Sequence, residues 1–435
     1  MVATILFRAV QTGGLVLAAF TTFSACNASA QDTRITALAR EQKPAMLETM
    51  RELVAFESGS REIEELDRIA AHIASKFQAL GAKVELVEPT EATTTRFSDT
   101  PERIGKMVKA TFTGSGKAKI LLLAHMDTVY PKGMLARQPF RVEGNRAYGL
   151  GIADDKQGIA VILHVMTILK SLDFRDYGTI TVLINGDEEI SSPAGRYHQA
   201  MLGESHDVTL SYEGGGNPEE ARLRLATSGI ALAHLNVRGR ASHAGSAPEQ
   251  GINSLRELAF QIGQMSDLSD PKAGIKVNWT LAKAGVVHNM IPPEAHATAD
   301  VRVERVADFD VAEKALRERV RKQLLPEAKV ELTFERHFFP LELRPVSRAL
   351  AEHAKAIYGE VGKPIVIRER STGGGTDASN AAMRAKGPVI EGFGLQGFGS
   401  HTVDAEYILI DSIEPKLYLS TRLIMDIARG KAPLK

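Results

Sequence analysis

The chain of 435 residues contains one cysteine, Cys26, and one tryptophan. Because a disulfide needs two cysteines, this chain cannot form one within itself. It has no excess of charge either: 53 basic and 53 acidic residues leave a formal net charge of +0, which does not favour nucleic acid as a partner. What remains is an ordinary soluble composition, 44% hydrophobic and 24% charged, in a chain long enough for two domains.

Residues 1–30 differ in composition from the rest of the chain. Arg8 is their only charged residue, apolar residues predominate between 15 and 23, and the segment ends in Ala28-Ser29-Ala30. This pattern predicts a secretory signal removed after Ala30, too short for a membrane span, and therefore a periplasmic or secreted protein. The stretch Phe-Ser-Ala-Cys26 loosely resembles a bacterial lipoprotein cleavage box, so lipid attachment to Cys26 is an alternative. Phenylalanine in place of the usual leucine argues against it.

Three polar clusters interrupt apolar segments between residues 121 and 189. They are His125-Met126-Asp127, Asp154-Asp155 and Asp187-Glu188-Glu189. The first follows the segment 119–124 and the third follows 179–184. Short apolar segments closed by polar residues are typical of parallel strands covered on both faces, and sites in open α/β sheets lie at the carboxyl ends of such strands. We therefore expect these clusters at one edge of a sheet.

The side chains in these clusters are of the kinds that bind divalent metals. A catalytic metal is held by neutral imidazole and ionised carboxylate while one position stays open for water. Taken alone, each cluster has a simpler interpretation, because His-x-Asp is often a local hydrogen-bonded pair and a run of acids is often a solvated loop. Three in succession, each beside an expected strand or helix, favour a metal site.

The segments around these clusters resemble the co-catalytic zinc exopeptidases, a family that includes aminoacylases and succinyl-diaminopimelate desuccinylase. The likeness is strongest to glutamate carboxypeptidases of the carboxypeptidase G type and covers nearly all of the chain after residue 40. It is carried by His-Met-Asp-Thr-Val-Tyr (125–130), Tyr-Gly-Leu-Gly-Ile-Ala-Asp-Asp-Lys (148–156), Asp-Glu-Glu (187–189), Ala-Ser-His-Ala-Gly (241–245), Thr-Gly-Gly-Gly-Thr-Asp-Ala (372–378) and His-Thr-Val-Asp-Ala-Glu-Tyr (401–407). The resemblance implies an α/β fold, with a zinc-exopeptidase-like catalytic domain on a mixed central sheet and an inserted ferredoxin-like α+β domain for dimerisation or as a lid.

The order of expected elements locates the insertion. From about residue 228 the periodicity predicts strand, helix, strand, strand, helix and strand, the order of a ferredoxin-like unit: 230–237, 249–265, 276–284, 295–303, 308–323 and 329–335. Outside it, we expect helices at 42–56, 61–80, 159–172, 346–358 and 412–428, and strands at 83–88 and 208–211. The catalytic domain is thus expected to span 31–227 and 344–435, and the inserted domain 228–343.

The resemblance further implies a dinuclear zinc site, with two ions per chain. The ligands it implies are His125, Asp154 and Glu213 for one ion, and Glu189, Asp154 and His401 for the other. These nitrogen and oxygen donors suit zinc without excluding cobalt or manganese. Glu188 would carry the proton of the attacking water to the leaving nitrogen, and Asp127 would accept the free ring N–H of His125. The Asp154–Asp155 peptide bond is expected to be cis.

The inserted domain is expected to contribute to the site as well. By resemblance, His243 stabilises the tetrahedral intermediate, either across a dimer or from a closing lid, while Asn289 and Arg302 bind the substrate. For Arg302 there is a simpler alternative, in which its guanidinium pairs with a neighbouring acid such as Asp300 or Glu304.

A glycine loop, Thr372 to Asp377, opens a helix expected to begin at about residue 376. Such a loop presents backbone N–H groups, here including those of Gly374 and Gly375, to an anion. A phosphate-binding loop would need a lysine after its glycines, and none follows. A substrate carboxylate is therefore the favoured ligand.

The reaction implied is hydrolysis of the amide bond before a carboxy-terminal amino acid, with glutamate as the leaving residue. Arg222 and Arg224 depart from the related sequences, although added positive charge suits an acidic substrate. The stretch from Glu335 to Phe338 also departs, and Phe338 and Phe339 would suit a larger acyl group or another terminal side chain. The expected partners are a small peptide or N-acyl amino acid and a second copy of the chain.

Two other functions remain open. An aminoacylase would cleave simple N-acyl amino acids with the same metal site. A non-catalytic periplasmic peptide-binding protein is disfavoured, because binding alone needs no proton carrier such as Glu188. The polar loop 90–103 suggests no chemistry, and His164, in an apolar helix, is expected to pack rather than bind metal.

Overall fold

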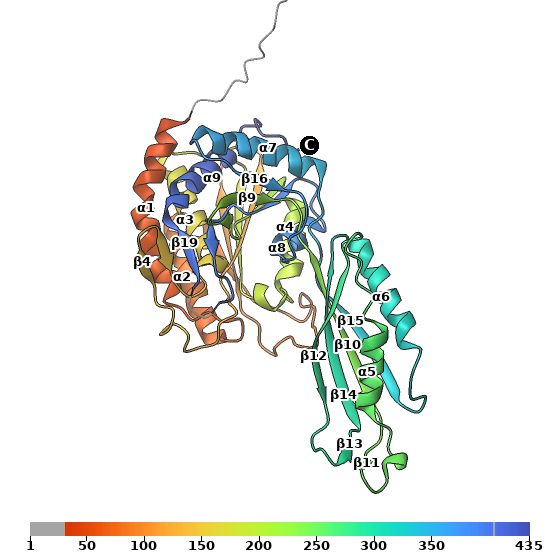
Figure 1. Ribbon diagram of the computed structural model, residues 1–435. Helices are drawn as coiled ribbons and strands as arrows, with labels where there is room; N and C mark the ends of the chain where they lie inside the picture. The colour runs from red at the N-terminus through yellow and green to blue at the C-terminus, as the bar shows by residue number, and fades with distance from the viewer. Residues whose placement is uncertain (1–30, 403–404) are drawn as a thin grey trace, which may run out of the picture.

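The structure is a computed structural model that describes residues 31–402 and 405–435. Two sheets of different kinds organise this part of the chain into a catalytic domain and an inserted domain that projects from it (Figure 1). None of the helices in the described ranges is both long and apolar enough to cross a bilayer. The expected secretory signal and Cys26 lie outside the described residues.

The catalytic domain is built on a nine-stranded mixed sheet. In order of pairing its strands are β1 (Lys83–Val87), β2 (Met107–Thr113), β6 (Thr179–Asn185), β3 (Lys119–His125), β7 (Val208–Ser211), β17 (Val389–Glu391), β9 (Glu220–Arg224) and β16 (Val366–Arg368), with β8 (Gly216–Asn217) beside β9. β3 runs parallel to β6 and β7, and β7 runs parallel to β17, whereas β2 is antiparallel to β1 and β6. The mixed central sheet expected from the sequence is therefore confirmed.

Helices cover both faces of this sheet. Successive side chains of a strand point to opposite faces, so β3 sends Ile120, Leu122 and Ala124 to one side and Leu121 and Leu123 to the other. The first side packs against α1 (Thr33–Val54), α2 (Ile63–Ala79), α3 (Gln157–Ser171), α7 (Pro345–Glu360) and α9 (Ile413–Ala428), and the second against α4 (Gly195–Ser205) and α8 (Asp377–Ala382). Burial on both faces explains why residues 120–124 of this strand are all apolar.

A small four-stranded sheet lies beside the nine-stranded sheet within the catalytic domain. It consists of β18 (Gly397–Phe398), β19 (Tyr407–Leu409), β5 (Arg146–Tyr148) and β4 (Arg141–Glu143), in that order. Its pairing of β19 with β5 brings the segment after residue 397 next to the turn that precedes α3.

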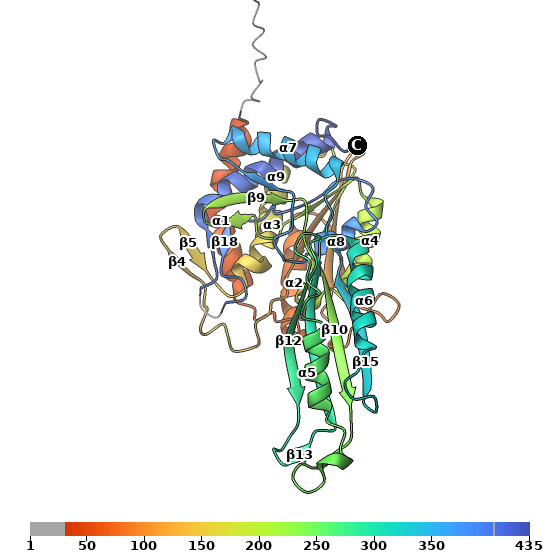
Figure 2. The same ribbon diagram turned by 45° about the vertical axis from the view of Figure 1, so that its right-hand side comes forward.

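The inserted domain has the β-α-β-β-α-β order of a ferredoxin-like unit, as expected. Its elements are β10 (Gly229–Arg238), α5 (Ser254–Gln264), β12 (Lys276–Ala284), β14 (Glu294–Val303), α6 (Val306–Val320) and β15 (Lys329–Phe338), and the antiparallel sheet has the order β12-β14-β10-β15. Alternate residues of β10 are buried, which places Ala231, Ala233, Leu235 and Val237 under the two helices. A short pair of strands, β11 (Ser242–His243) and β13 (Met290–Ile291), forms the far tip (Figures 1 and 2).

Some element boundaries differ from the expectation for local reasons. The helix expected at 42–56 begins at Thr33, because the side chain of Asp32 caps it by accepting the N–H groups of Arg34 and Ile35. The helix expected at 249–265 begins at Ser254, after a separate 3-10 turn at Pro248–Gln250, and Asn253 caps it. Helix α4 and the short strands β9, β16 and β17 were not expected, since they lack a clear period.

Candidate metal centre

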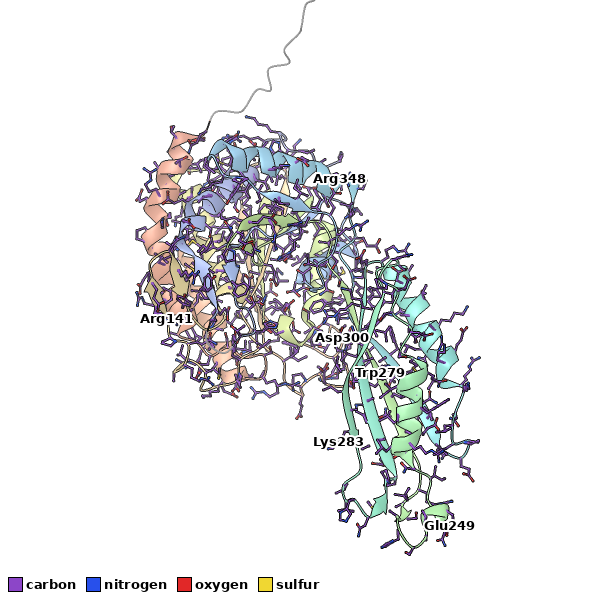
Figure 3. The ribbon with its side chains drawn as sticks, viewed as in Figure 1. Arg141, Glu249, Trp279, Lys283, Asp300 and Arg348 are labelled. Atoms are coloured by element: carbon purple, nitrogen blue, oxygen red, sulfur yellow. The ribbon has the colours of Figure 1, made fainter. Side chains whose placement is uncertain are left out.

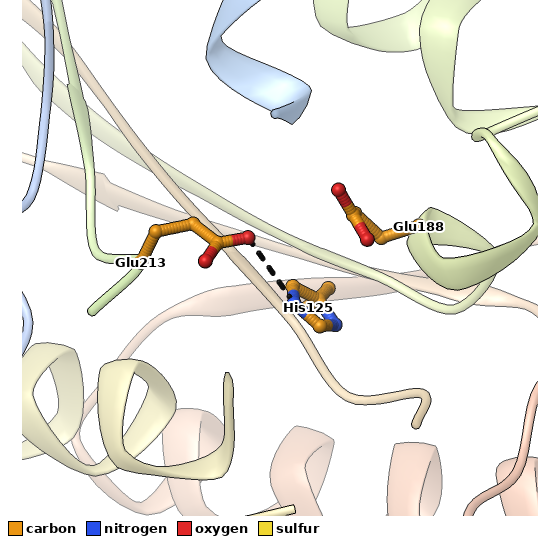
Figure 4. A group of neighbouring side chains, drawn as sticks. All are labelled: His125, Glu188 and Glu213. Atoms are coloured by element: carbon orange, nitrogen blue, oxygen red, sulfur yellow. Dashed lines mark ion pairs between the residues drawn. The ribbon is translucent and has the colours of Figure 1, made fainter. Parts of the chain in front are cut away.

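Six potential ligands reach the carboxyl edge of the central sheet from separate segments. They are His125 at the end of β3, Asp154 in the turn Ile152–Lys156 before α3, Glu188 and Glu189 in the 3-10 turn Glu188–Ile190 after β6, Glu213 after β7 and His401 after β18. The parallel register of β3 and β6 sets His125 beside Asn185, so the polar residues that follow both strands emerge at one edge. The polar clusters identified in the sequence therefore meet in space, and Figure 4 shows three of these side chains facing one another.

The two imidazoles share one carboxylate. His125 Nε2 lies 3.1 Å from Asp154 Oδ1, and His401 Nε2 lies 3.2 Å from Asp154 Oδ2. His125 Nε2 is also 3.2 Å from Glu213 Oε1 (dashed in Figure 4), and His401 Nε2 is 3.2 Å from Glu189 Oε2. Two groups have their donor atoms within 4.8 Å of one another: His125, Glu188 and Glu213, and Asp154, Glu189 and His401.

Burial perturbs the acids of this cluster. It raises the pKa of Glu213 to about 7 and that of Glu189 to about 8, and in both cases the negative charge of Asp154 adds to the effect. It raises the pKa of Glu188 well above its usual range. Burial also acts upward on Asp154, but hydrogen bonds from the two histidines outweigh it and hold the Asp154 pKa below its usual range.

The histidines respond to the same charges. Hydrogen bonds to Asp154 and Glu189 raise the pKa of His401 to about 10. Burial lowers the pKa of His125, but its bonds to three carboxylates outweigh this and the net shift is strongly upward. Both shifts mean that the cluster holds more negative charge than its own side chains neutralise.

The donor set fits a pair of divalent cations. All of its donors are imidazole nitrogens and carboxylate oxygens, and the two oxygens of Asp154 face one histidine each, as a bridging ligand would. Glu189 Oε1 is buried and has no hydrogen-bond partner among the described residues, which suits a ligand atom. Cations at these positions would supply the missing positive charge.

Asp127 acts mainly on the turn that carries Glu188. Its Oδ1 accepts the N–H of Glu188 at 3.1 Å, and its Oδ2 accepts the N–H of Glu189 at 3.0 Å and the hydroxyl of Ser60 at 2.8 Å. His125 Nδ1, expected to meet this carboxylate, lies 3.1 Å from the backbone oxygen of Asp127 and 3.4 Å from Oδ1. The turn engages the carboxylate, so the carbonyl oxygen is the nearer acceptor for the ring.

Glu406 supports the turn that carries Asp154, a role that no local sequence pattern indicated. Its carboxylate accepts the Tyr130 hydroxyl at 2.7 Å and the backbone N–H groups of Ala153 at 2.8 Å and Asp154 at 3.1 Å. The Asp154–Asp155 peptide bond in this turn is cis, as the resemblance implies. Only a comparison of side chains in space could have identified Glu406, because it lies more than 250 residues from the turn it holds.

A second set of buried polar groups, also not anticipated, lies behind the Glu188 turn. Asp377 accepts hydrogen bonds from the Ser192 hydroxyl and from Asn185 Nδ2, the latter at 3.0 Å. Asn185 ends β6 and Ser192 follows Glu189 by three residues, so Asp377 fixes both ends of the turn. For the glycine loop 372–377, which includes Asp377, the sequence predicts only a substrate contact. His164, by contrast, packs as expected, bonded to Thr49 at 2.9 Å.

The cluster opens into a cleft of about 580 Å³ lined by both domains, and Gly374 and Gly375 contribute to its wall. Arg302 lines it too, but its Nε and Nη2 donate to Asp300 at 2.8 and 2.7 Å and its Nη1 donates to the Gly373 carbonyl at 3.0 Å. The pairing with Asp300 is the simpler alternative foreseen from the sequence. Together with the bond to Gly373, this pairing leaves two N–H groups of the Arg302 guanidinium without a partner among the described residues. Figure 3 shows Asp300 near the junction of the domains.

The two unexpected arginines behave differently. Arg224 lines the cleft, where its Nη2 donates to the Gly214 carbonyl at 2.9 Å and to Glu391 at 3.2 Å. Arg222 pairs with Glu220 at 2.5 Å and does not line the cleft. Only Arg224 is therefore placed to meet a ligand.

His243 and Asn289 lie together at the far tip of the inserted domain, away from the cleft of their own chain (Figure 1). The N–H of Ala244 donates to the Asn289 carbonyl at 2.9 Å. The His243 ring is exposed, and its Nδ1 accepts the N–H groups of Gly245 and Ser246, each at 3.1 Å. These two bonds set the ring proton of the neutral form on Nε2.

Comparisons with known proteins agree with this geometry. A family model described as peptidase family M20/M25/M40 matches residues 121–426. Carboxypeptidase G2 from Pseudomonas sp. strain RS-16 is 42% identical over 413 residues, which cover 94% of this chain and 96% of that protein. Acetylornithine deacetylase from Salmonella paratyphi B is 30% identical over 234 residues, 52% of this chain and 56% of that protein.

A solved structure shares the fold. A metallo-carboxypeptidase of the M20 family from Sulfolobus solfataricus superposes with a TM-score of 0.69 at 16% sequence identity, covering 88% of this chain and 99% of that one. At this identity the likeness shows the fold alone.

Proposed function

This chain belongs to peptidase family M20/M25/M40, and we propose that it is a dinuclear zinc carboxypeptidase that releases a carboxy-terminal amino acid, with glutamate as the favoured residue. That it is a metal-dependent hydrolase follows from the family and from its likeness to carboxypeptidase G2. The observation that carries the proposal is the pair of ligand groups joined by Asp154, with Glu188 beside them in an open cleft.

Zinc fits these donors, and two ions would be held as the resemblance implied. His125, Asp154 and Glu213 would bind one, and Glu189, Asp154 and His401 the other. When bound, such a pair polarises the substrate carbonyl and lowers the pKa of the attacking water toward about 7.

Glu188 is the proposed proton carrier. Its carboxylate lies in the first ligand group but faces the cleft, and Asp127 fixes its backbone N–H. Burial raises its pKa, which favours its taking up a proton from the water. Glu188 would take the proton from the water and deliver it to the leaving nitrogen, which must depart as a neutral amine.

The substrate carboxylate would lie against the glycine loop and Arg302. The guanidinium keeps two N–H donors beyond its bonds to Asp300 and Gly373, enough for a planar bidentate contact, and Gly374 and Gly375 line the same wall. Arg224, held by Glu391, adds positive charge that suits an acidic leaving residue such as glutamate.

A second copy of the chain would complete the site. His243 and Asn289 point away from their own cleft, and edge strand β12 exposes Leu281, while Val286 and Val287 are exposed in the loop that follows. An unpaired edge with exposed apolar residues is suited to association. In a homodimer, His243 and Asn289 would reach the partner's cleft, where His243 Nε2–H would stabilise the tetrahedral intermediate.

The proposed location is periplasmic or secreted. Support comes from the sequence of residues 1–30, whose small residues before Gln31 suit signal cleavage. Mass spectrometry of the protein purified from a bacterial periplasm should give a chain that starts at Gln31. A chain starting at a lipid-bearing Cys26 would favour the lipoprotein alternative.

A panel of dipeptides and N-acyl amino acids that differ in the terminal residue tests the function. Release of glutamate from folyl-type or peptide substrates should exceed release from acetyl-amino acids, and a chelator should abolish it until zinc is restored. Acetyl-amino acids as the better substrates would favour the aminoacylase alternative, which the partial likeness to acetylornithine deacetylase supports. Fewer than two metal ions per active chain by elemental analysis would exclude the dinuclear site.

A further inference from the structure

Arg196, the second residue of α4, connects the two domains. Its Nε donates to the Ser192 carbonyl at 3.2 Å and its Nη2 to the Ser191 carbonyl at 2.7 Å, at the end of the turn that carries Glu188. Nη2 also donates to the His337 carbonyl, and Nη1 donates to the Arg336 carbonyl at 3.5 Å, both in β15 of the inserted domain. One guanidinium thus holds four carbonyl oxygens, two from each domain.

The backbone is irregular on both sides of this guanidinium. Ser191 and Ser192 have φ of 72° and 49°, a left-handed conformation that residues other than glycine keep only where their surroundings enforce it. In the inserted domain, the pairing of β10 with β15 shifts its register between Ile230 and Ala231, which leaves His337 as an extra residue in a bulge. Arg196 therefore stabilises two backbone segments that regular hydrogen bonding does not fix.

Side chains complete this joint. His337 Nδ1 lies 2.9 Å from the Ser191 hydroxyl, and the ring stacks on Phe97 with centroids 4.1 Å apart and an 18° angle between planes. The Arg196 guanidinium also lies over the Phe97 ring, 4.6 Å from its centre. Ser98 then donates its hydroxyl to Glu335 Oε2 at 2.8 Å. The loop 90–103, for which no chemistry was expected, is part of the contact.

We propose that Arg196 is a positioning residue that couples the placement of the inserted domain to the turn carrying Glu188. This inference rests on the proposed function. A shift of the bulged end of β15 moves the His337 carbonyl and ring, and both are bonded to the residues that end the Glu188 turn, directly or through Arg196. Docking of the inserted domain therefore fixes the carboxylate that must reach both water and leaving nitrogen, while a displaced domain releases it.

Arg196→Met, compared with Arg344→Met, tests this coupling in activity. Arg344 also donates to two backbone carbonyls, of Gly387 at 2.8 Å and Lys386 at 3.2 Å, but both lie in the catalytic domain away from the cleft. Because Arg196 does not line the cleft, its loss should lower kcat about 10- to 100-fold, the scale of a small misplacement of a catalytic group, and leave KM within about threefold. Arg344→Met should leave kcat unchanged. Equal kcat in the two variants would overturn the proposal.

Hydrogen exchange of the full chain tests the same coupling without relying on activity. Arg196→Met should speed exchange of the amides in 186–192 at least about tenfold, and so should His337→Phe, which keeps the stack on Phe97 but loses the bond to Ser191. Arg344→Met should speed exchange only near 386–388. Unchanged exchange of 186–192 in His337→Phe would overturn the proposal. If the wild type hydrolysed no peptide, the proposed function would fail while this measurement still decided the coupling.

Discussion

A buried glutamate of the catalytic domain and one of the inserted domain differ in the groups that surround their carboxylates. In the catalytic domain, Glu188 is 8% exposed and lies among other acids, whose negative charges disfavour its ionised form. In the inserted domain, Glu257 is 0% exposed, and its oxygens accept hydrogen bonds from the Gln261 side chain at 2.8 Å and from the backbone N–H groups of Leu324 and Leu325 at 3.0 and 2.7 Å. Both carboxyl groups are buried, but of the two only that of Glu257 is surrounded by hydrogen-bond donors.

This difference separates a reactive carboxylate from a structural one. A buried acid that accepts enough hydrogen bonds is a stable part of the fold, and removing its charge costs stability. A buried acid left among like charges is held there at a cost in stability, and such groups gather where protons or cations must be handled. The catalytic domain concentrates groups of this second kind at one sheet edge, whereas the helix-covered core of the inserted domain is formed by apolar residues.

The largest effect expected from this contrast is on turnover. Glu188→Gln keeps the size of the side chain but cannot carry a proton, so kcat should fall by about two to four orders of magnitude while two metal ions remain bound. Glu257→Gln, the matched change in the inserted domain, should lower the melting temperature and leave kcat unchanged. Stopped assays with a saturating peptide, together with elemental analysis, measure both. Normal turnover in Glu188→Gln would remove this residue from the mechanism.

The next effect concerns His243, which the inserted domain is proposed to supply to the cleft of a partner subunit. His243→Ala and Glu188→Gln proteins should each be nearly inactive, but a mixture whose subunits exchange should regain activity, because a heterodimer contains one site with both residues intact. His288→Ala, which changes another exposed histidine near the same tip, should remain active alone. Exchange demonstrated by native mass spectrometry without any regained activity would confine His243 to its own chain or to no role.

The sequence indicated the residues that meet at the sheet edge better than the residues that support them. His125 ends a strand, and Glu188, Glu189 and Glu213 each follow one, and strand ends can be read from a change in periodicity. Glu406 and Asp377 hold the turns that carry ligands, yet they reach them from the other end of the chain, and no local pattern reveals a contact across such a distance.

The helices and strands could likewise be predicted only where a local pattern marks them. Long periodic elements such as β10 and α9 were found within one or two residues, because burial on one side imposes a period that the sequence must keep. Strands of three residues, such as β16 and β17, are too short for any period. The polar composition of the loop 90–103 suggests no chemistry, whereas Phe97 and Ser98 make contacts with β15 that depend on the placement of the inserted domain.

A smaller effect is expected for the anchor of the substrate carboxylate. The wild type should cleave an N-acyl glutamate at least about ten- to a hundredfold better than its α-amide, since hydrogen bonds between charged groups contribute about 1.5–3 kcal/mol each. Arg302→Ala should discriminate weakly. Arg305→Ala is the matched control, because Arg305 forms a similar pair with Asp308 at 2.6 Å but lies outside the cleft. Equal discrimination by wild type and Arg302→Ala would mean that Arg302 serves Asp300 alone.

The smallest expected effect is on stability alone, and it concerns the buried histidine His164. Burial lowers the pKa of His164 to about 4, and the charge of Lys76 adds to this, whereas an unfolded chain has the ordinary value of about 6.5. The unfolded chain therefore binds the proton first as the pH falls. The stability that His164 contributes is complete above about pH 6.5 and is lost progressively as the pH falls to about 4, by about 3 kcal/mol in all.

His164→Gln removes this titration and keeps polar atoms near Thr49 and Gln42, to which the ring is bonded at 2.9 and 2.8 Å. Its melting temperature should therefore fall less than that of the wild type between pH 7 and pH 4. His296→Gln in the inserted domain should reproduce the wild-type dependence closely, because the His296 ring is half-buried and water reaches it. If His164→Gln and the wild type lost stability in parallel, the His164 imidazole would take up its proton in the folded chain as readily as in the unfolded chain.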